Sequence, residues 1–100
     1  KEFENLGITV WNITGEIREG LGLLDDTVGV VVVDVLETSE AFKKGMKSGD
    51  VITEAGQEKI VSLSDFEAQV EATIEGGRKT MLLLVRRAGD PRFLALTVQD

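Results

Sequence analysis

The side chains of this sequence that could do chemistry are carboxylates, lysines and serines, because the chain has neither histidine nor cysteine. Without histidine it cannot build a Ser-His-Asp triad or a histidine-ligated zinc site from its own residues. Without cysteine it lacks disulfides, thiolate metal ligands and cysteine nucleophiles. Asp25 and Asp26 do not have the oxygen-ligand spacing of a calcium loop, so we interpret them as a solvated turn. The sequence therefore predicts a non-catalytic domain without metal or cofactor, and a carboxylate-dependent hydrolase is the alternative.

The composition is that of one globular domain with an acidic surface. The chain has 100 residues, of which 42% are hydrophobic and 29% charged, which allows one core and is too short for two domains. Its net charge of −7 repels phosphate backbones and anionic lipids, so nucleic acid is not an expected partner. The longest apolar run, VGVVVVDV, has the length of a strand, and membrane insertion is not expected either.

Most of the predicted elements are short strands. Alternating or β-branched apolar residues predict strands over 7–13, 28–36, 51–56 and 58–62. Two further strands are predicted within 80–98, joined by a turn at 88–91. The strand over 28–36 is apolar on both faces, so we expect it in the middle of the sheet.

The segment SEAFKKGMKSGDVI predicts a short helix followed by a tight turn. Ser39 is a suitable N-cap for a helix over 40–44, and Gly45 is a suitable residue to end it in a left-handed conformation. Gly49 and Asp50 then precede an apolar strand. Asp50 can accept amide hydrogens of the turn, which we favour over a role as a catalytic acid.

A second, longer helix is predicted over 62–77. Ser64 and Glu67 fit a capping box at its start. An apolar stripe at helical spacing gives it one buried face, made by Phe66, Val70 and Ile74. The segment 14–24 is rich in glycine, so we expect a connector with one or two helical turns. Together these elements predict a mainly β fold of the α+β class, a small and partly open antiparallel barrel or sandwich capped by one short and one long helix.

The run GVVVVDV, followed by SEAFKKGMKSGDVITEAGQEKI, resembles a PDZ domain of the bacterial type found in HtrA/Do-family (DegP-like) serine proteases. Glu40 and Met46 depart from the usual proline and leucine. The resemblance covers residues 6–98, and the matching positions are Ser39, Ala41, Gly45, Gly49, Asp50, Val51 and Ile52. It implies that residues 1–100 are one circularly permuted PDZ domain, a fragment of a larger periplasmic serine endopeptidase whose catalytic residues lie elsewhere.

The resemblance also implies a site. PDZ domains bind a peptide C-terminus or an extended segment of an unfolded protein as an added strand, between a sheet edge and the long helix. The terminal carboxylate meets backbone amides of a Φ-G-Φ turn, which NLGI matches here. The implied peptide- and carboxylate-binding residues are Asn5, Leu6, Gly7, Ile8, Thr9 and Val10, opposite Asp65, Gln69, Ala72 and Thr73 of the helix.

In this arrangement Leu6 and Ile8 line an apolar pocket, and Gly7 lets the carboxylate approach without a Cβ in the way. Replacing Gly7 by valine is then expected to weaken binding and leave the fold largely standing. Two alternatives remain open. The domain could mediate contacts with neighbouring subunits of the parent protease, or belong to another bacterial protease class, such as a site-2 or tail-specific protease.

Overall fold

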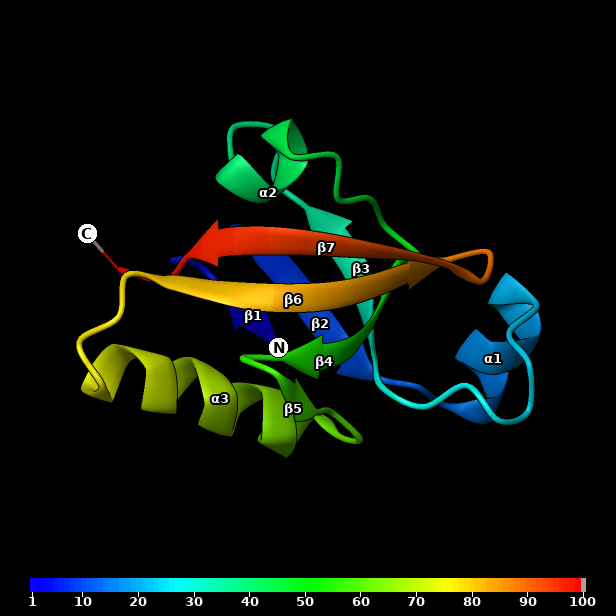
Figure 1. Ribbon diagram of the computed structural model, residues 1–100. Helices are drawn as coiled ribbons and strands as arrows, with labels where there is room; N and C mark the ends of the chain where they lie inside the picture. Colours follow the sequence, from blue (N-terminus) through cyan, green and yellow to red (C-terminus); the bar gives the residue numbers. More distant parts are fainter. Residues whose placement is uncertain (100) are drawn as a thin grey trace.

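The computed structural model describes residues 1–99 and consists of one seven-stranded antiparallel sheet with three helices (Figure 1). In chain order the elements are β1 (Glu2–Phe3), β2 (Ile8–Asn12), α1 (Gly15–Leu21), β3 (Val30–Val35), α2 (Glu40–Lys43), β4 (Val51–Ala55), β5 (Glu58–Lys59), α3 (Leu63–Glu75), β6 (Thr80–Arg87) and β7 (Asp90–Thr97). From β2 onward this is the order that the sequence predicts. β1 is an addition, because the sequence predicts no strand before residue 7.

The sheet runs in the order β1-β2-β3-β4-β6-β7, with β5 paired to β4 off this path. β3 lies between β2 and β4, which confirms the central position predicted for 28–36. β6 and β7 run across the direction of β2 and β3, so the sheet curls into a half-open barrel (Figure 1). The predicted mainly β class is confirmed. The helical turns expected in the connector form α1, which raises the number of helices to three.

α3 covers the hollow side of the curled sheet. It buries Phe66 and Val70, and Ile74 is partly buried, so the predicted apolar stripe does face the core. The strands other than β5 contribute most of the remaining side chains of the core, among them Ile8, Val10, Val30, Val32, Ile52, Met81, Leu83 and Leu96. Because the burial of this stripe fixes the rotation of α3 about its own axis, it also fixes the direction in which each flank of the helix faces.

The capping box of α3 lies two residues earlier than the sequence predicts. The Oγ of Ser62 accepts the backbone N–H of Asp65 at 3.4 Å, and the Asp65 carboxylate accepts the N–H of Ser62 at 3.2 Å. The helix begins here because the side chain of Asn12 on β2 accepts the N–H of Leu63 at 2.7 Å. The prediction of Ser64 and Glu67 is therefore wrong, although the pair actually used has the same spacing.

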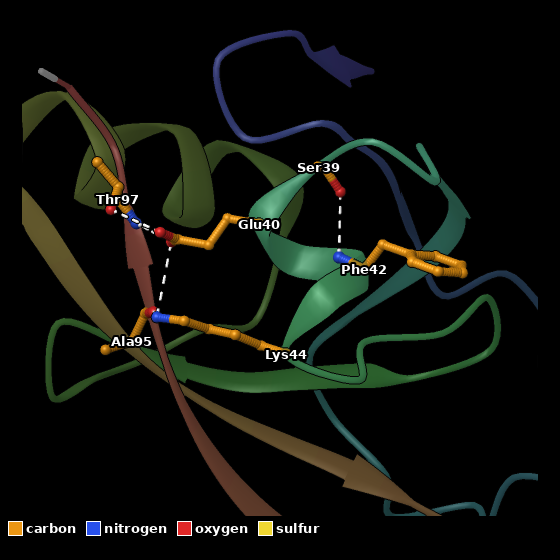
Figure 2. Close-up of polar contacts among 6 residues, drawn as sticks. All are labelled: Ser39, Glu40, Phe42, Lys44, Ala95 and Thr97. Atoms are coloured by element: carbon orange, nitrogen blue, oxygen red, sulfur yellow. Dashed lines mark hydrogen bonds and ion pairs between the residues drawn. The ribbon is translucent and has the colours of Figure 1, made fainter.

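α2 is tied at both ends to neighbouring backbone (Figure 2). Ser39 is its N-cap, as predicted, and accepts the N–H of Phe42 at 3.1 Å. The Glu40 carboxylate accepts the N–H of Thr97 on β7 at 2.7 Å and its hydroxyl at 3.0 Å. These bonds, with Lys44 nearby, lower the pKa of Glu40 below its usual range. The ammonium of Lys44 donates to the carbonyl of Ala95 on β7, so the short helix is held against this strand.

Asp50 organises the turn between α2 and β4. Its carboxylate accepts the N–H of Lys47 at 2.9 Å, which confirms the role expected from the sequence. The same carboxylate accepts Nε and Nη2 of Arg87 at 2.7 and 2.9 Å, and Nη2 also donates to the carbonyl of Gly45 at 2.6 Å. The bonds to Asp50 raise the pKa of Arg87. The local sequence around Asp50 does not reveal that Arg87 on β6 is its partner.

Candidate functional site

The turn that leads into β2 adopts a conformation that favours glycine. Gly7 has a φ of 71°, and a Cβ at this position would lie 2.4 Å from the Cβ of Ser39. Its carbonyl accepts the N–H of Leu36 at 2.9 Å, and the side-chain amide of Asn5 donates to the carbonyl of Val98 at 2.9 Å. The expectation that valine at Gly7 leaves the fold standing is corrected, because the added side chain would collide with the N-cap of α2.

The amides of this turn converge on one oxygen atom. The N–H groups of Leu6 and Gly7 donate to the carbonyl of Phe3 at 3.0 and 2.8 Å. The side chains of Leu6 and Ile8 are only 4% and 1% exposed, so they belong to the core, and their part in a ligand pocket stays a prediction. The resemblance implies outward amides and an apolar pocket for the last side chain of a ligand. The structure has the convergent amides, but the chain itself supplies the acceptor.

β1 lies along the edge of β2 that the resemblance assigns to a ligand. It pairs antiparallel with Ile8 and Thr9, and the carbonyl of Lys1 accepts the N–H of Val10 at 2.8 Å. β1 runs toward the turn at Gly7, so its C-terminal end meets the convergent amides. This is the direction in which a peptide would run if its terminal carboxylate faced the same amides.

Side chains of β1 fill the space between β2 and α3. Phe3 is 7% exposed, and its ring meets that of Phe66 edge-on, with centroids 5.0 Å apart at 88°. The Lys1 ammonium lies 3.5 Å from the Glu67 carboxylate, at a partly exposed position. β2 and α3 are therefore the two walls of a groove, and β1 occupies it.

The flank of α3 that faces β1 is not the one expected. Gln69 points to the β4–β5 turn, where its Oε1 would lie 3.1 Å from a Cβ on Gly56. Thr73 is 8% exposed and donates its hydroxyl to the Gln69 carbonyl at 2.8 Å. Asp65 serves the helix cap and Ala72 is exposed. Burial of the apolar stripe turns the opposite flank, which carries Glu67, toward β1, and contact of the four predicted helix residues with a peptide stays a prediction.

The chemistry available here is that of strand pairing. Within residues 1–99, no cluster of three or more acidic, histidine or cysteine side chains is placed to hold a metal ion. Over the same range no helix is long and apolar enough to cross a membrane. The groove offers an edge strand, two convergent amides, an aromatic wall and one carboxylate, which suits it to hold an extended chain segment.

Residues 5–98 match the family PDZ_2, described as a PDZ domain. The chain belongs to the PDZ domain family. This PDZ domain is 38% identical over 87 residues to a probable periplasmic serine endoprotease DegP-like of Bartonella henselae, a match covering 83% of this chain and 17% of the relative. A protein of the same name from Brucella suis is 34% identical over 90 residues, covering 86% and 18%. The chain thus spans less than a fifth of these relatives.

Solved structures agree with the assignment. The HtrA-type protease AlgW, solved with a decapeptide, superposes with a TM-score of 0.75 at 30% identity, covering 92% of this chain and 27% of that chain. The HtrA3 PDZ domain bound to a phage-derived ligand, FGRWV, has a TM-score of 0.68 at 24% identity, covering 94% and 81%, and supports the fold alone. The resemblance to DegP-like PDZ domains is confirmed.

The sequence prediction missed two contributors to the groove, Phe3 before the Φ-G-Φ turn and Glu67 on α3. Phe3 is a single aromatic residue in a polar segment, and nothing local requires its burial. Glu67 was assigned to a capping box that forms elsewhere. One sequence signal could have found Phe3. It lies five residues before Ile8 with Gly7 between them, a spacing that lets a hairpin bring the two residues side by side.

Proposed function

We propose that this PDZ domain binds the C-terminus of another protein, or an extended hydrophobic segment of it, as an added strand on β2. The observation that carries the proposal is the pairing of β1. In this pairing the outer edge of β2 lies against an antiparallel strand and the amides of Leu6 and Gly7 donate to an oxygen at its end, which supports the proposal. A terminal carboxylate is a stronger acceptor for such convergent amides than a carbonyl, because it carries a negative charge.

The proposed roles follow the geometry. Ile8, Thr9 and Val10 supply backbone for pairing, and Asn5 holds the turn in place through Val98. Phe66 and Glu67 form the wall on α3. Asp65 also caps α3, Gln69 lies beside Gly56 and Thr73 donates to the Gln69 carbonyl, and these residues, with Ala72, stay predicted neighbours of a bound peptide. With one pocket and a few residues of pairing, the affinity should be about micromolar.

The relatives support a longer parent protein. Their names describe periplasmic serine endoproteases, which favours a periplasmic, HtrA-type parent over site-2 or tail-specific proteases. In that parent this domain is a non-catalytic module that recognises segments of unfolded proteins and regulates or feeds a separate protease domain. AlgW, at 30% identity and solved with a decapeptide, supports the peptide-binding part of the proposal.

An NMR titration of the chain tests peptide binding directly. The probe is an apolar peptide with a free carboxyl terminus at up to millimolar concentration, and the matched control is the same peptide with a C-terminal amide. We expect the amide resonances of Leu6 to Val10 to shift with the free acid, and the amidated peptide to bind about tenfold more weakly because the negative charge is lost. If neither peptide moves these resonances, the groove does not bind peptides.

A role in assembly is the second candidate, and one observation favours it. Around α1 and the connector that follows, three apolar side chains are exposed, Leu21, Leu24 and Val28, at 46%, 72% and 39%. Sedimentation of the chain across a concentration series tests this role. Self-association that Leu24→Asp abolishes supports assembly, and a monomer at every concentration leaves peptide binding as the function.

A further inference from the structure

We infer that residues 1–3 are an internal ligand of the groove, so that a peptide binds after β1 leaves, and that favoured peptides share its pattern. That pattern is an aromatic residue with a basic residue two positions before it. The inference rests on the peptide-binding function proposed above. It adds two statements to that function: the groove is self-occupied, and the occupant indicates which external peptides fit.

The backbone of β1 uses the contacts that an incoming peptide would need. Ile8 and Thr9 are already paired, and the N–H of Val10 donates to the carbonyl of Lys1. The amides of Leu6 and Gly7 donate to the carbonyl of Phe3. Because each of these N–H groups has one hydrogen to donate, β1 and an external strand cannot use them at the same time.

The side chains of β1 define the recognition pattern. Phe3 is buried against Phe66 between β2 and α3, which identifies a pocket suited to an aromatic or large apolar residue. Two residues earlier, on the same side of the strand, Lys1 approaches the Glu67 carboxylate at 3.5 Å. Glu67 therefore disfavours an acidic residue at that position of a peptide and favours a basic one.

β1 is built to leave more easily than the other strands. It has two residues, and within residues 1–99 its one neighbour in the sheet is β2. A two-residue edge pairing is marginal by itself, and its ion pair with Glu67 is exposed to solvent and contributes little. Detachment of residues 1–3 leaves β2 through β7 paired, so opening is local and does not require the domain to unfold.

A reversible disulfide tests whether β1 must leave. Glu2 and Thr9 face each other, next to the hydrogen-bonded pair of Lys1 and Val10, so they form a non-hydrogen-bonded pair whose Cβ atoms are close enough to bridge. The chain has no cysteine of its own, so the variant Glu2→Cys/Thr9→Cys can form this bridge alone. The probe is fluorescein-Gly-Ser-Gly-Lys-Glu-Phe with a free carboxyl terminus, measured by fluorescence anisotropy.

We expect the oxidised variant to lose binding by at least about a hundredfold, and reduction by dithiothreitol to restore it, since a locked groove has almost no open fraction. In the opposite direction, Phe3→Ala should bind the probe about tenfold more tightly than the natural chain, because the internal ligand loses its anchor. Glu4→Ala, an exposed change in the adjoining turn, is the matched control and should bind as the natural chain does.

The outcomes separate this inference from the proposed function. Equal binding by the oxidised and reduced forms overturns the internal ligand and leaves peptide binding in place. No binding by any form, including a Phe3→Ala chain that circular dichroism finds folded, overturns both. The pattern is tested with probes ending in Glu-Glu-Phe and Lys-Glu-Ala, which should each bind more weakly than Lys-Glu-Phe. If they bind equally well, β1 does not represent the preferred ligand.

Discussion

The contact between Gly7 and Ser39 gives the sharpest test of the structure, through the substitution Gly7→Ala. Alanine would carry two separate costs at this position. A φ of 71° lies in the left-handed region, which costs a residue with a Cβ about 1–2 kcal/mol. The new Cβ would also lie 2.4 Å from the Cβ of Ser39. Ordinary contact between carbon atoms is about 3.5–4.0 Å, so one segment must move by about 1 Å.

Such overpacking costs about 1–3 kcal/mol, and we expect Gly7→Ala to lower the free energy of unfolding by about 2–5 kcal/mol in total. The collision can be removed by Ser39→Gly, which takes away the opposing Cβ. By itself this change should cost about 0.5 kcal/mol, because glycine is an acceptable N-cap. In the Ser39→Gly background, Gly7→Ala should cost only the backbone part, about 1–2 kcal/mol.

Urea unfolding followed by far-ultraviolet circular dichroism measures the four chains of this double-mutant cycle. Gly77→Ala is the matched control: Gly77 has a φ of 75° and nothing within 4 Å of its added Cβ. Gly77→Ala should lower the free energy of unfolding only by the cost of the left-handed backbone, about 1–2 kcal/mol, and by the same amount with serine or glycine at position 39. If Gly7→Ala costs the same in both backgrounds, the close approach between the turn and α2 does not exist and the reasoning fails.

Two further predictions concern buried and partly exposed charges. Arg87→Met should cost about 3 kcal/mol in urea unfolding, because it leaves the carboxylate of Asp50, 2% exposed, without its main partner; a loss below about 1 kcal/mol would contradict this. Thr97 lowers the pKa of Glu40 below its ordinary 4.5, so the stability that ionised Glu40 contributes is complete above that value and is lost as pH falls through the folded pKa. The stability difference between the natural chain and Glu40→Gln should therefore be constant near pH 7 and shrink as the pH falls below 4.5, and an unchanged difference would refute the bond.

The sequence by itself determined the strands from β2 onward, the places of α2 and α3 along the chain, and the family. The β-branched run at 30–35 is apolar on both faces, which predicts a strand in the middle of the sheet. The start and the end of the short helix follow from Ser39 and Gly45, which are close to it in the chain. The turn at 88–91 could also be placed, because Ala88 and Gly89 form a tight hairpin with positive φ at both positions. These features depend on residues close together in the chain, so local rules suffice to predict them.

The tertiary structure decided which side of α3 faces the groove and what fills it. The start of α3 depends on Asn12 from a distant strand, so the capping box could not be chosen from two candidates with equal spacing. The burial of Phe3 depends on Phe66, far along the chain, and no local rule pairs them. Gly7 could be recognised as part of a Φ-G-Φ turn from the sequence alone. Its approach to Ser39, and the position of β1 in the groove with the Phe3 carbonyl at the turn amides, arise only when the hairpin, α2 and α3 pack together.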